Sequence, residues 1–478
     1  MMKIYDQFYI NGQWVEPTNK KLMDVINPST EAVCARIAIG NAEDVDKAAK
    51  AASKSFATYG LSSLADRIEI MQSIITAFKN RYNDIADAIT EEMGAPTQLA
   101  VKAQTGAGLA HFKAAAALLE SFPFKQQQAA SLIVKEPIGV CGLITPWNWP
   151  LNQIACKVAP AIAVGCTVIL KPSEIAPLSG YIFSQVMDEA GLPSGVYNMI
   201  NGDGPGVGTA LSQHPLIDMV SFTGSTRAGA LVAKNAAPSI KRVSQELGGK
   251  SANIILPDAD FERAVKQGAR SVFSNSGQSC NAPTRMLVPV DKMKQAEIIA
   301  AGVAAKVVVG PATDESTTMG PVVSQVQYDK ICGLIETGIA ENAKLICGGV
   351  QRPEGLNKGY FIKPTVFSEV NNDMTIAKEE IFGPVFAIMP YDSIDQAIEI
   401  ANDTPYGLAG YVQGNDQETL NYVASRIRAG NININGQSGD INTPFGGYKK
   451  SGNGREWGAH GFNDYLEVKA ISGLGSVN

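Results

Sequence analysis

The fold of this chain is decided by a stretch that begins with GVCGLIT at positions 139–145 and ends with KRVSQEL at positions 241–247. Apolar segments of strand length recur through it, at 139–145, 166–171, 196–200, 218–222 and 241–247. Helix-like segments separate them, at 152–164, 176–190, 206–213 and 226–235. Such alternation of apolar strands with helices is typical of a parallel, doubly wound α/β sheet.

Glycine and polar residues gather where the predicted strands end. The sequences at these points are TPWN at 145–148, KPSE at 171–174, GDG at 202–204, TGS at 223–225 and ELGG at 246–249. In a doubly wound sheet, ligands bind where the carboxyl ends of strands meet the N-termini of helices. The pattern therefore favours a dinucleotide site along this edge.

Length and charge limit the classes of protein. The 478 residues exceed what one hydrophobic core usually holds, so two or more domains are expected. The net charge is −6 and no basic block occurs, which argues against nucleic-acid binding. The N-terminus shows no secretory signal, and the apolar runs are far shorter than the roughly 20 residues of a membrane span. A cytoplasmic protein with no membrane partner is expected.

Cys280 differs from the other cysteines in its surroundings. The seven cysteines are odd in number and form no CxxC motif, and six of them are interpreted as small buried hydrophobes in a reducing cytosol. Cys280 instead lies in the polar loop SNSGQSCN at 274–281, the setting of reactive thiols. A lone cysteine in a loop more often has no catalytic role, so the other residues of the site decide whether Cys280 is a nucleophile. The three histidines are too far apart in sequence to suggest a metal site or a catalytic triad.

Other strand-end residues each have two interpretations. Glu246 can serve as a general base or be a surface charge, and Asn148 can donate to an oxyanion or form a turn. The glycines of GDGPGVG at 202–208 suit a phosphate loop or a simple tight turn equally well. Glu174 can accept hydrogen bonds from ribose hydroxyls or belong to a helix cap, and without further support the cap is favoured.

Together these motifs show a family likeness. From position 8 to about 469 the chain resembles the NAD(P)-dependent aldehyde dehydrogenase superfamily, and the motifs occur in family order and at family spacing. The matching segments are TPWNWPL at 145–151, KPSE at 171–174, FTGST at 222–226, ELGGK at 246–250, GQSC at 277–280, EEIFGPV at 379–385 and PFGGYK at 444–449.

The resemblance implies an α/β fold like that of aldehyde dehydrogenases, with two doubly wound parallel domains and a small β oligomerisation arm. Residues 1–118 and 138–248 would form the Rossmann-like NAD(P)-binding domain, and 249–447 the catalytic domain that carries the nucleophilic cysteine. The arm would comprise 119–137 and 464–478, because a hairpin at 127–135 and a terminal strand at 465–472 look exposed. Strands that leave their own domain usually pair with a neighbouring chain, so a homodimer or homotetramer is expected.

The resemblance also implies the chemistry. Cys280 would attack the aldehyde, Asn148 and the Cys280 N–H would hold the oxyanion, and Glu246 would activate the water that hydrolyses the thioester to a carboxylate. The cofactor-binding residues would be Trp147, Lys171, Ser173, Glu174, Gly204, Gly208, Ser225, Glu380 and Phe382. Lys157 and Glu456 would form a proton-relay pair near the base.

Several alternatives stay open from the sequence alone. Glu174 would repel a 2′-phosphate, which favours NAD, whereas the adjacent Lys171 would tolerate NADP. A CoA-acylating enzyme uses the same cysteine, although a hydrolytic base such as Glu246 would waste its thioester. A catalytically silent NAD-binding relative is a third alternative. Gln153 and Cys156, together with GDIN at 439–442, predict a roomier and more polar substrate pocket than simple aliphatic aldehydes need.

Overall fold

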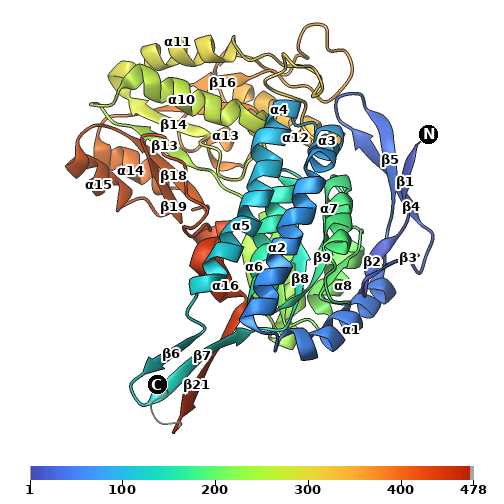
Figure 1. Ribbon diagram of the computed structural model, residues 1–478. Helices are drawn as coiled ribbons and strands as arrows, with labels where there is room; N and C mark the ends of the chain where they lie inside the picture. The colour runs from blue at the N-terminus through green and yellow to red at the C-terminus, as the bar shows by residue number, and fades with distance from the viewer. Residues whose placement is uncertain (1, 474–478) are drawn as a thin grey trace.

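The computed structural model of the chain describes residues 2–473. Figure 1 shows two α/β bodies. The first carries α2 (Leu64–Asn80) and α6 (Pro150–Val164), and a thin β arm projects from it. The second carries α10 (Phe261–Phe273) and α11 (Met293–Ala304). Within the described residues, no helix is both long and apolar enough to cross a membrane.

The first body is built on a sheet whose order, over residues 2–473, is β20-β12-β11-β8-β9-β10-β2-β3. The five central strands run parallel, and each matches a predicted segment to within one residue at either end. Antiparallel strands extend both edges. The strands are β8 (Val140–Ile144), β9 (Thr167–Lys171), β10 (Tyr197–Met199), β11 (Met219–Thr223), β12 (Arg242–Glu246), β2 (Phe8–Ile10), β3 (Gln13–Val15) and β20 (Gly452–Asn453).

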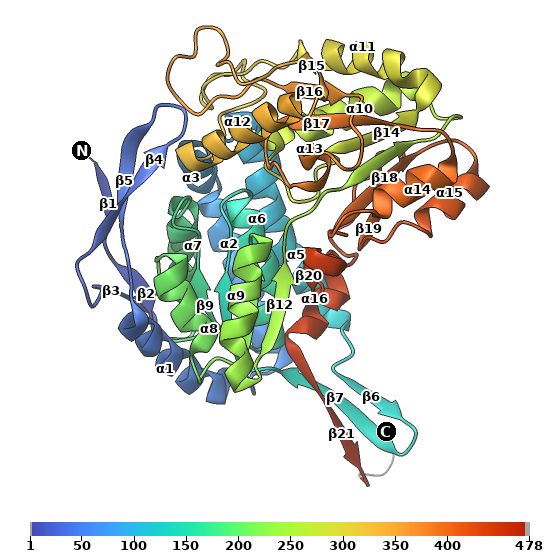
Figure 2. The same ribbon diagram turned by 180° about the vertical axis from the view of Figure 1, so that it is seen from behind.

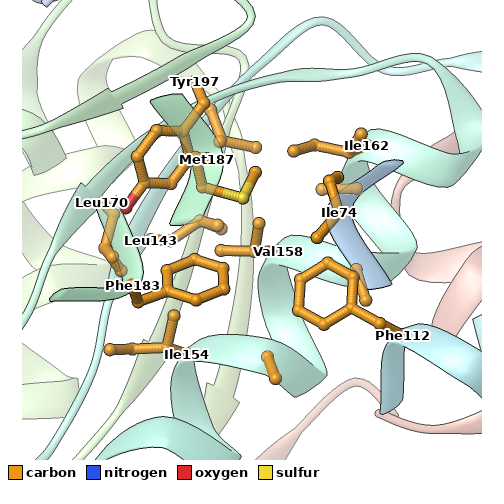
Figure 3. Close-up of a cluster of buried hydrophobic side chains, with 14 of the residues drawn as sticks. Ile74, Phe112, Leu143, Ile154, Val158, Ile162, Leu170, Phe183, Met187 and Tyr197 are labelled. Carbon is orange, nitrogen blue, oxygen red and sulfur yellow. The ribbon is translucent and has the colours of Figure 1, made fainter. Parts of the chain in front are cut away.

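Helices cover both faces of this sheet, which explains why its central strands are apolar on both sides. Alternate strand residues point to opposite faces, so Leu143 and Leu170 pack on one face with Val158 and Phe183, as Figure 3 shows. Val140 packs on the other face. The first face is covered by α2, α5 (Gly106–Ser121), α6 and α7 (Leu178–Glu189), and the second by α1 (Ala42–Tyr59), α8 (Thr209–Gln213) and α9 (Thr226–Ala236).

The second body contains a sheet of order β15-β16-β17-β14-β13-β18-β19 among the described strands, parallel except for the edge strand β15. Its strands are β13 (Ala252–Ile255), β14 (Arg285–Pro289), β15 (Lys344–Cys347), β16 (Thr365–Ser368), β17 (Val385–Tyr391), β18 (Ala409–Gln413) and β19 (Asn431–Ile434). Its helices are α10, α11, α12 (Gln325–Ala340), α13 (Thr375–Lys378), α14 (Ile394–Asn402) and α15 (Gln417–Ala424).

The arm and the N-terminal strands complete the molecule. β6 (Lys125–Gln128), β7 (Ser131–Pro137) and β21 (Leu466–Ser472) form the projecting antiparallel sheet at the predicted hairpin and terminal strand, while positions 474–478 of the predicted arm lie outside the described residues. A separate sheet that was not predicted contains β1 (Lys3–Tyr5), β4 (Leu22–Asn27) and β5 (Ala32–Ala38). The remaining helices are α3 (Tyr82–Met93), α4 (Thr97–Leu99) and α16 (Gly458–Asp464).

Two local expectations require correction. The segment 206–213 is not one helix, because Gly204–Gly208 forms a π-helical turn capped by the Asp203 carboxylate before α8 begins. Of the six cysteines predicted to be buried, Cys141, Cys156 and Cys166 are buried, whereas Cys34, Cys332 and Cys347 are partly exposed. Those three lie in strands or helices that have one solvent-facing side, so an apolar neighbourhood in sequence does not ensure burial.

Candidate active site

Cys280 is held by a loop with an unusual backbone. After α10 the chain passes through a short 3₁₀ turn, Ser274–Gly277, in which Asn275 and Ser276 have φ angles of 52° and 55°. Asparagine tolerates this left-handed conformation better than most residues, but serine rarely adopts it. Such strain persists only where the surroundings fix the conformation, and here it delivers Cys280 to the wall of a cavity between the two bodies.

A chain of buried amides fixes both the loop and Asn148. Gln104 donates from Nε2 to Asn275 Oδ1 at 3.0 Å, and Asn275 Nδ2 donates to the Asn148 carbonyl, also at 3.0 Å. Asn148 Nδ2 in turn donates to the Gln278 carbonyl at 3.0 Å. An amide nitrogen carries two hydrogens, and among residues 2–473 this is the one bond that Asn148 Nδ2 donates. The second hydrogen is therefore available to an oxyanion.

The cavity brings together six of the predicted site residues. It has a volume of about 130 Å³, and its walls include Trp147, Asn148, Ser225, Cys280, Glu380 and Phe382. Trp147 and Phe382 meet edge to face, with ring centroids 5.3 Å apart. Sequence reasoning missed Gln327 and Lys330, which also line it. Both lie in α12, in a segment that matches no recognisable motif. Lys330 Nζ donates to the Glu380 carbonyl at 2.8 Å.

The glycine pair of the ELGG motif has a steric explanation. A Cβ atom on Gly249 would lie 2.3 Å from the Cys280 carbonyl oxygen, and one on Gly248 would lie 2.5 Å from Glu380 Oε2. The Gly249 N–H also donates to Glu380 Oε1 at 2.9 Å. The missing side chains thus let the nucleophile loop and the Glu380 carboxylate approach the end of β12.

The Cys280 thiol is not pre-ionised. Burial raises its pKa above the ordinary value of 9.0, and the charges of Glu380 and Glu246 raise it further. A polar loop in the sequence therefore does not imply a low pKa, because burial and the charges of the two carboxylates decide the ionisation of this thiol. The thiol needs a base that removes its proton when it attacks.

Glu246 has the properties of such a base. It ends β12, is buried, and neither carboxylate oxygen has a hydrogen-bond partner in the described part of the chain. Burial raises the pKa of Glu246 well above 4.5, and the nearby charge of Glu456 adds to the effect. The surface-charge interpretation is therefore wrong. A desolvated carboxylate with free lone pairs is suited to accept a proton from a thiol or from water.

Lys157 and Glu456 form a buried pair beside this base. Lys157 Nζ lies 2.5 Å from Glu456 Oε1 and donates to the Ser221 hydroxyl at 3.0 Å. The second Glu456 oxygen accepts from the Cys156 thiol at 3.3 Å. Burial alone would lower the pKa of Lys157, but the opposing charge of Glu456 raises it above 10.5. β20, just before Glu456 in the sequence, pairs with β12, the strand that ends in Glu246, and Figure 2 shows α16 beside these two strands.

The remaining predicted residues lie apart from the Cys280 cavity. Lys171 Nζ pairs with Glu174 Oε2 at 3.0 Å, and Ser173, Gly204 and Gly208 lie near this end of the sheet without lining the cavity. The helix-cap interpretation of Glu174 is wrong, since α7 begins four residues later at Leu178. The carboxylate of Glu92, which the sequence analysis did not consider, instead accepts from the N–H groups of Leu178 and Ser179.

A second, small cavity lies next to Cys156. It is lined mainly by apolar and aromatic side chains, including Ile441 and Trp457. Trp457 stacks on Phe445 with ring centroids 4.7 Å apart, and the centroid of the His111 ring lies 5.6 Å from that of Trp457. The roomy, polar substrate pocket of the sequence analysis stays a prediction.

Comparison with known proteins agrees with this geometry. A model of the aldehyde dehydrogenase family matches residues 14–471. A 3-succinoylsemialdehyde-pyridine dehydrogenase from a Pseudomonas species is 54% identical over 473 residues, which cover 99% of each chain. A solved structure of an aldehyde dehydrogenase C variant from Pseudomonas syringae, in complex with NAD⁺ and octanal, is 51% identical with a TM-score of 0.97, over 99% of this chain and 98% of that one.

A more distant structure has the same architecture. Betaine aldehyde dehydrogenase from Staphylococcus aureus, in complex with NAD⁺, is 36% identical with a TM-score of 0.94, over 98% of this chain and 94% of that one. The likeness extends through both bodies and the arm. The chain therefore belongs to the aldehyde dehydrogenase family, whose members oxidise aldehydes to carboxylic acids with NAD(P).

Proposed function

We propose that Cys280, Asn148 and Glu246 carry out aldehyde oxidation in this enzyme. The observation that carries the proposal is that a thiol and an amide with a free hydrogen line one cavity, and that the charge of an unpartnered carboxylate acts on this thiol, although the three groups come from distant parts of the chain. The Cys280 sulfur attacks the aldehyde carbon while Glu246 takes the thiol proton. The developing oxyanion receives the second Asn148 hydrogen and the Cys280 N–H, and one such donor is typically worth about 3 kcal/mol.

The cavity fits a dinucleotide on its own chemistry. Gly248 lets the Glu380 carboxylate come close to the end of β12 in the cavity wall, and Trp147 and Phe382 supply flat faces against which a ring can rest. We assign Trp147, Ser225, Glu380 and Phe382 to the nicotinamide half, and Lys171, Ser173, Glu174, Gly204 and Gly208 to the adenosine half. When bound, NAD accepts the hydride from the aldehyde carbon, and the protein positions the two reacting groups.

Hydrolysis of the Cys280 thioester then falls to Glu246. Its raised pKa makes it a stronger base than an ordinary carboxylate, so it can take a proton from water as the water attacks the thioester carbon. Before this step, the proton that Glu246 took from the Cys280 thiol passes to the Lys157–Glu456 pair and onward to solvent, which frees the carboxylate to accept another. The C–S bond then breaks, the carboxylic acid leaves, and the proton taken from water returns to the Cys280 sulfur.

Two variants test these roles, with octanal and NAD as the probes and NADH absorbance as the readout. Cys280→Ala should lose all oxidation and retain NAD binding, whereas turnover by this variant would refute the nucleophile assignment. Glu246→Gln should slow the NADH burst and should slow hydrolysis still more, so that an acyl-enzyme accumulates and is visible by intact mass. An unimpaired burst would show that Glu246 does not take the thiol proton, and unimpaired hydrolysis would show that it does not activate the water. Strict dependence of turnover on CoA would favour the acylating alternative.

The cofactor preference follows from the Lys171–Glu174 pair. A carboxylate at this point accepts hydrogen bonds from ribose hydroxyls and repels a 2′-phosphate, which supports NAD over NADP. The proposal is that the first body, residues 1–118 and 138–248, binds NAD, while residues 249–447 provide the nucleophile.

We also propose that the arm joins subunits into a dimer or tetramer. β21 pairs with β7 along seven residues, and most of its side chains are exposed, including Val468 at 66%. A projecting sheet with an apolar exposed residue and open edges is suited to pair with another copy of the chain. All seven cysteines are free, which fits a reducing compartment such as the cytoplasm.

A further inference from the structure

The Cys156 thiol has an acceptor unlike that of the other buried cysteines. It lies on α6 next to Lys157, and its sulfur is 3.3 Å from Glu456 Oε2. The backbone and side-chain oxygens of Gln153 are more distant acceptors, at 3.4 and 3.9 Å. An S–H group has one proton, and a charged carboxylate is the stronger acceptor. Glu456 is thus held by Lys157 on one oxygen and by Cys156 on the other.

We propose that Cys156 is a positioning residue, which fixes the Glu456 carboxylate between Lys157 and Glu246 and thereby sets the pH range in which Glu246 acts as a base. This inference rests on the proposed role of Glu246 in thioester hydrolysis. It assigns a task to a thiol that is 300 positions away from Glu456 in sequence and that takes no part in the chemical steps.

Cys156 can affect Glu246 because the carboxylates of Glu246 and Glu456 are both buried and lie close enough for their charges to interact. Glu456 is the largest charged contributor to the raised pKa of Glu246, after burial itself. Burial and the charge of Glu456 also raise the pKa of Cys156 well above 9.0, so the thiol keeps the proton that it donates. Loss of this donor removes one of the two groups that offset the negative charge of Glu456, so more of that charge acts on Glu246 and raises its pKa further.

The other groups that face these carboxylates are few. From α6 comes Lys157, from α5 the histidine His111, whose pKa burial lowers to about 4, and from the catalytic loop the thiol Cys280. The segment around α16 contributes Arg455, Asp464 and Tyr465. At neutral pH His111 is therefore uncharged, and Lys157 and Arg455 are the cations that oppose the two carboxylates.

The test measures how fast the octanoyl-enzyme formed from octanal and NAD decays at different pH values, by intact mass. The acid limb is the pH below which this decay slows. Cys156→Ala should move it upward by about one pH unit, which is the size expected for loss of one hydrogen bond to a charged group. Cys156→Ser, which keeps a donor, should restore the limb of the parent enzyme. Cys156→Val replaces the thiol by a group that fills the space without a donor, and should behave like the alanine variant.

Cys166→Ala is the matched control. Cys166 is also buried, and its sulfur donates at 3.3 Å, but to the backbone carbonyl of Tyr465. This variant should keep the acid limb in place even if it lowers the melting temperature. An unchanged limb in Cys156→Ala and Cys156→Val, or an equal shift in Cys156→Ser, would overturn the proposal. Unimpaired decay in Glu246→Gln would instead refute the proposed function, which separates the two failures.

Discussion

Two of the lysine–glutamate pairs on the first body of the molecule differ in their surroundings. Lys171 and Glu174 are three residues apart, 3.0 Å from each other, and the Glu174 side chain is 28% exposed. Lys157 and Glu456 are 299 positions apart, 2.5 Å from each other, and their side chains are 1% and 5% exposed. The first pair can turn to water or to a ligand, whereas the second is enclosed by the protein, with Ser221 and Cys156 as further partners, and acts on its neighbour Glu246.

The largest difference should appear when each lysine is replaced by methionine. Lys157→Met leaves two buried carboxylates without their nearest cation and should lower the free energy of unfolding by about 3–5 kcal/mol. Lys171→Met should cost about 1 kcal/mol or less, because Glu174 reaches solvent. Urea denaturation of both variants measures the contrast. Equal losses would show that burial does not distinguish the pairs.

The second expectation concerns pH. Glu246 must be ionised to accept a proton, and its pKa is raised above 4.5 by burial and by Glu456. Hydrolysis of the acyl-enzyme should therefore fall about tenfold for each pH unit below an acid limb that lies well above 4.5. The pH dependence of acyl-enzyme decay gives the limb directly. An acid limb near the ordinary pKa of a glutamate would mean that the buried Lys157–Glu456 pair does not affect the pKa of Glu246.

The smallest effect should come from the exposed pair. Glu174→Gln removes the negative charge that repels a 2′-phosphate and leaves Lys171 free to meet one. The ratio of kcat/KM for NADP to that for NAD should rise by about tenfold, or about 1.4 kcal/mol. Steady-state assays with both cofactors measure the ratio, and Glu16→Gln, in an exposed pair with Lys20 remote in sequence from the cofactor motifs, is the control. No change in the ratio would remove Glu174 from the cofactor site.

Local patterns predicted much of this molecule from sequence. The parallel strands of the first sheet, the hairpin of the arm and the strand-end positions of Asn148, Glu246 and Glu174 all follow from apolar runs and the residues that end them. Family motifs then grouped Cys280, Glu380 and Phe382, which do line one cavity. These predictions succeed because strand direction alone determines which edge each residue reaches.

Contacts between distant segments were not predictable in the same way. Gln104 holds Asn275 across 171 positions, and Cys156 meets Glu456 across 300, yet neither residue stands out in its own segment. The raised pKa of Cys280 likewise depends on Glu380 and Glu246, which the folded chain brings near it. Burial and electrostatics are properties of the assembled site, so a polar sequence around a thiol says little about its ionisation.

The position of Glu456 near the C-terminus also governs when the enzyme becomes active during its synthesis. Glu246 and Cys280 leave the ribosome well before β20, Glu456 and the arm strand β21. A nascent chain can fold its central strands while its base still lacks the carboxylate–ammonium pair beside it. The chain must therefore be synthesised through Glu456 before the protein can release an acid, and chains that stop before this position should be inert.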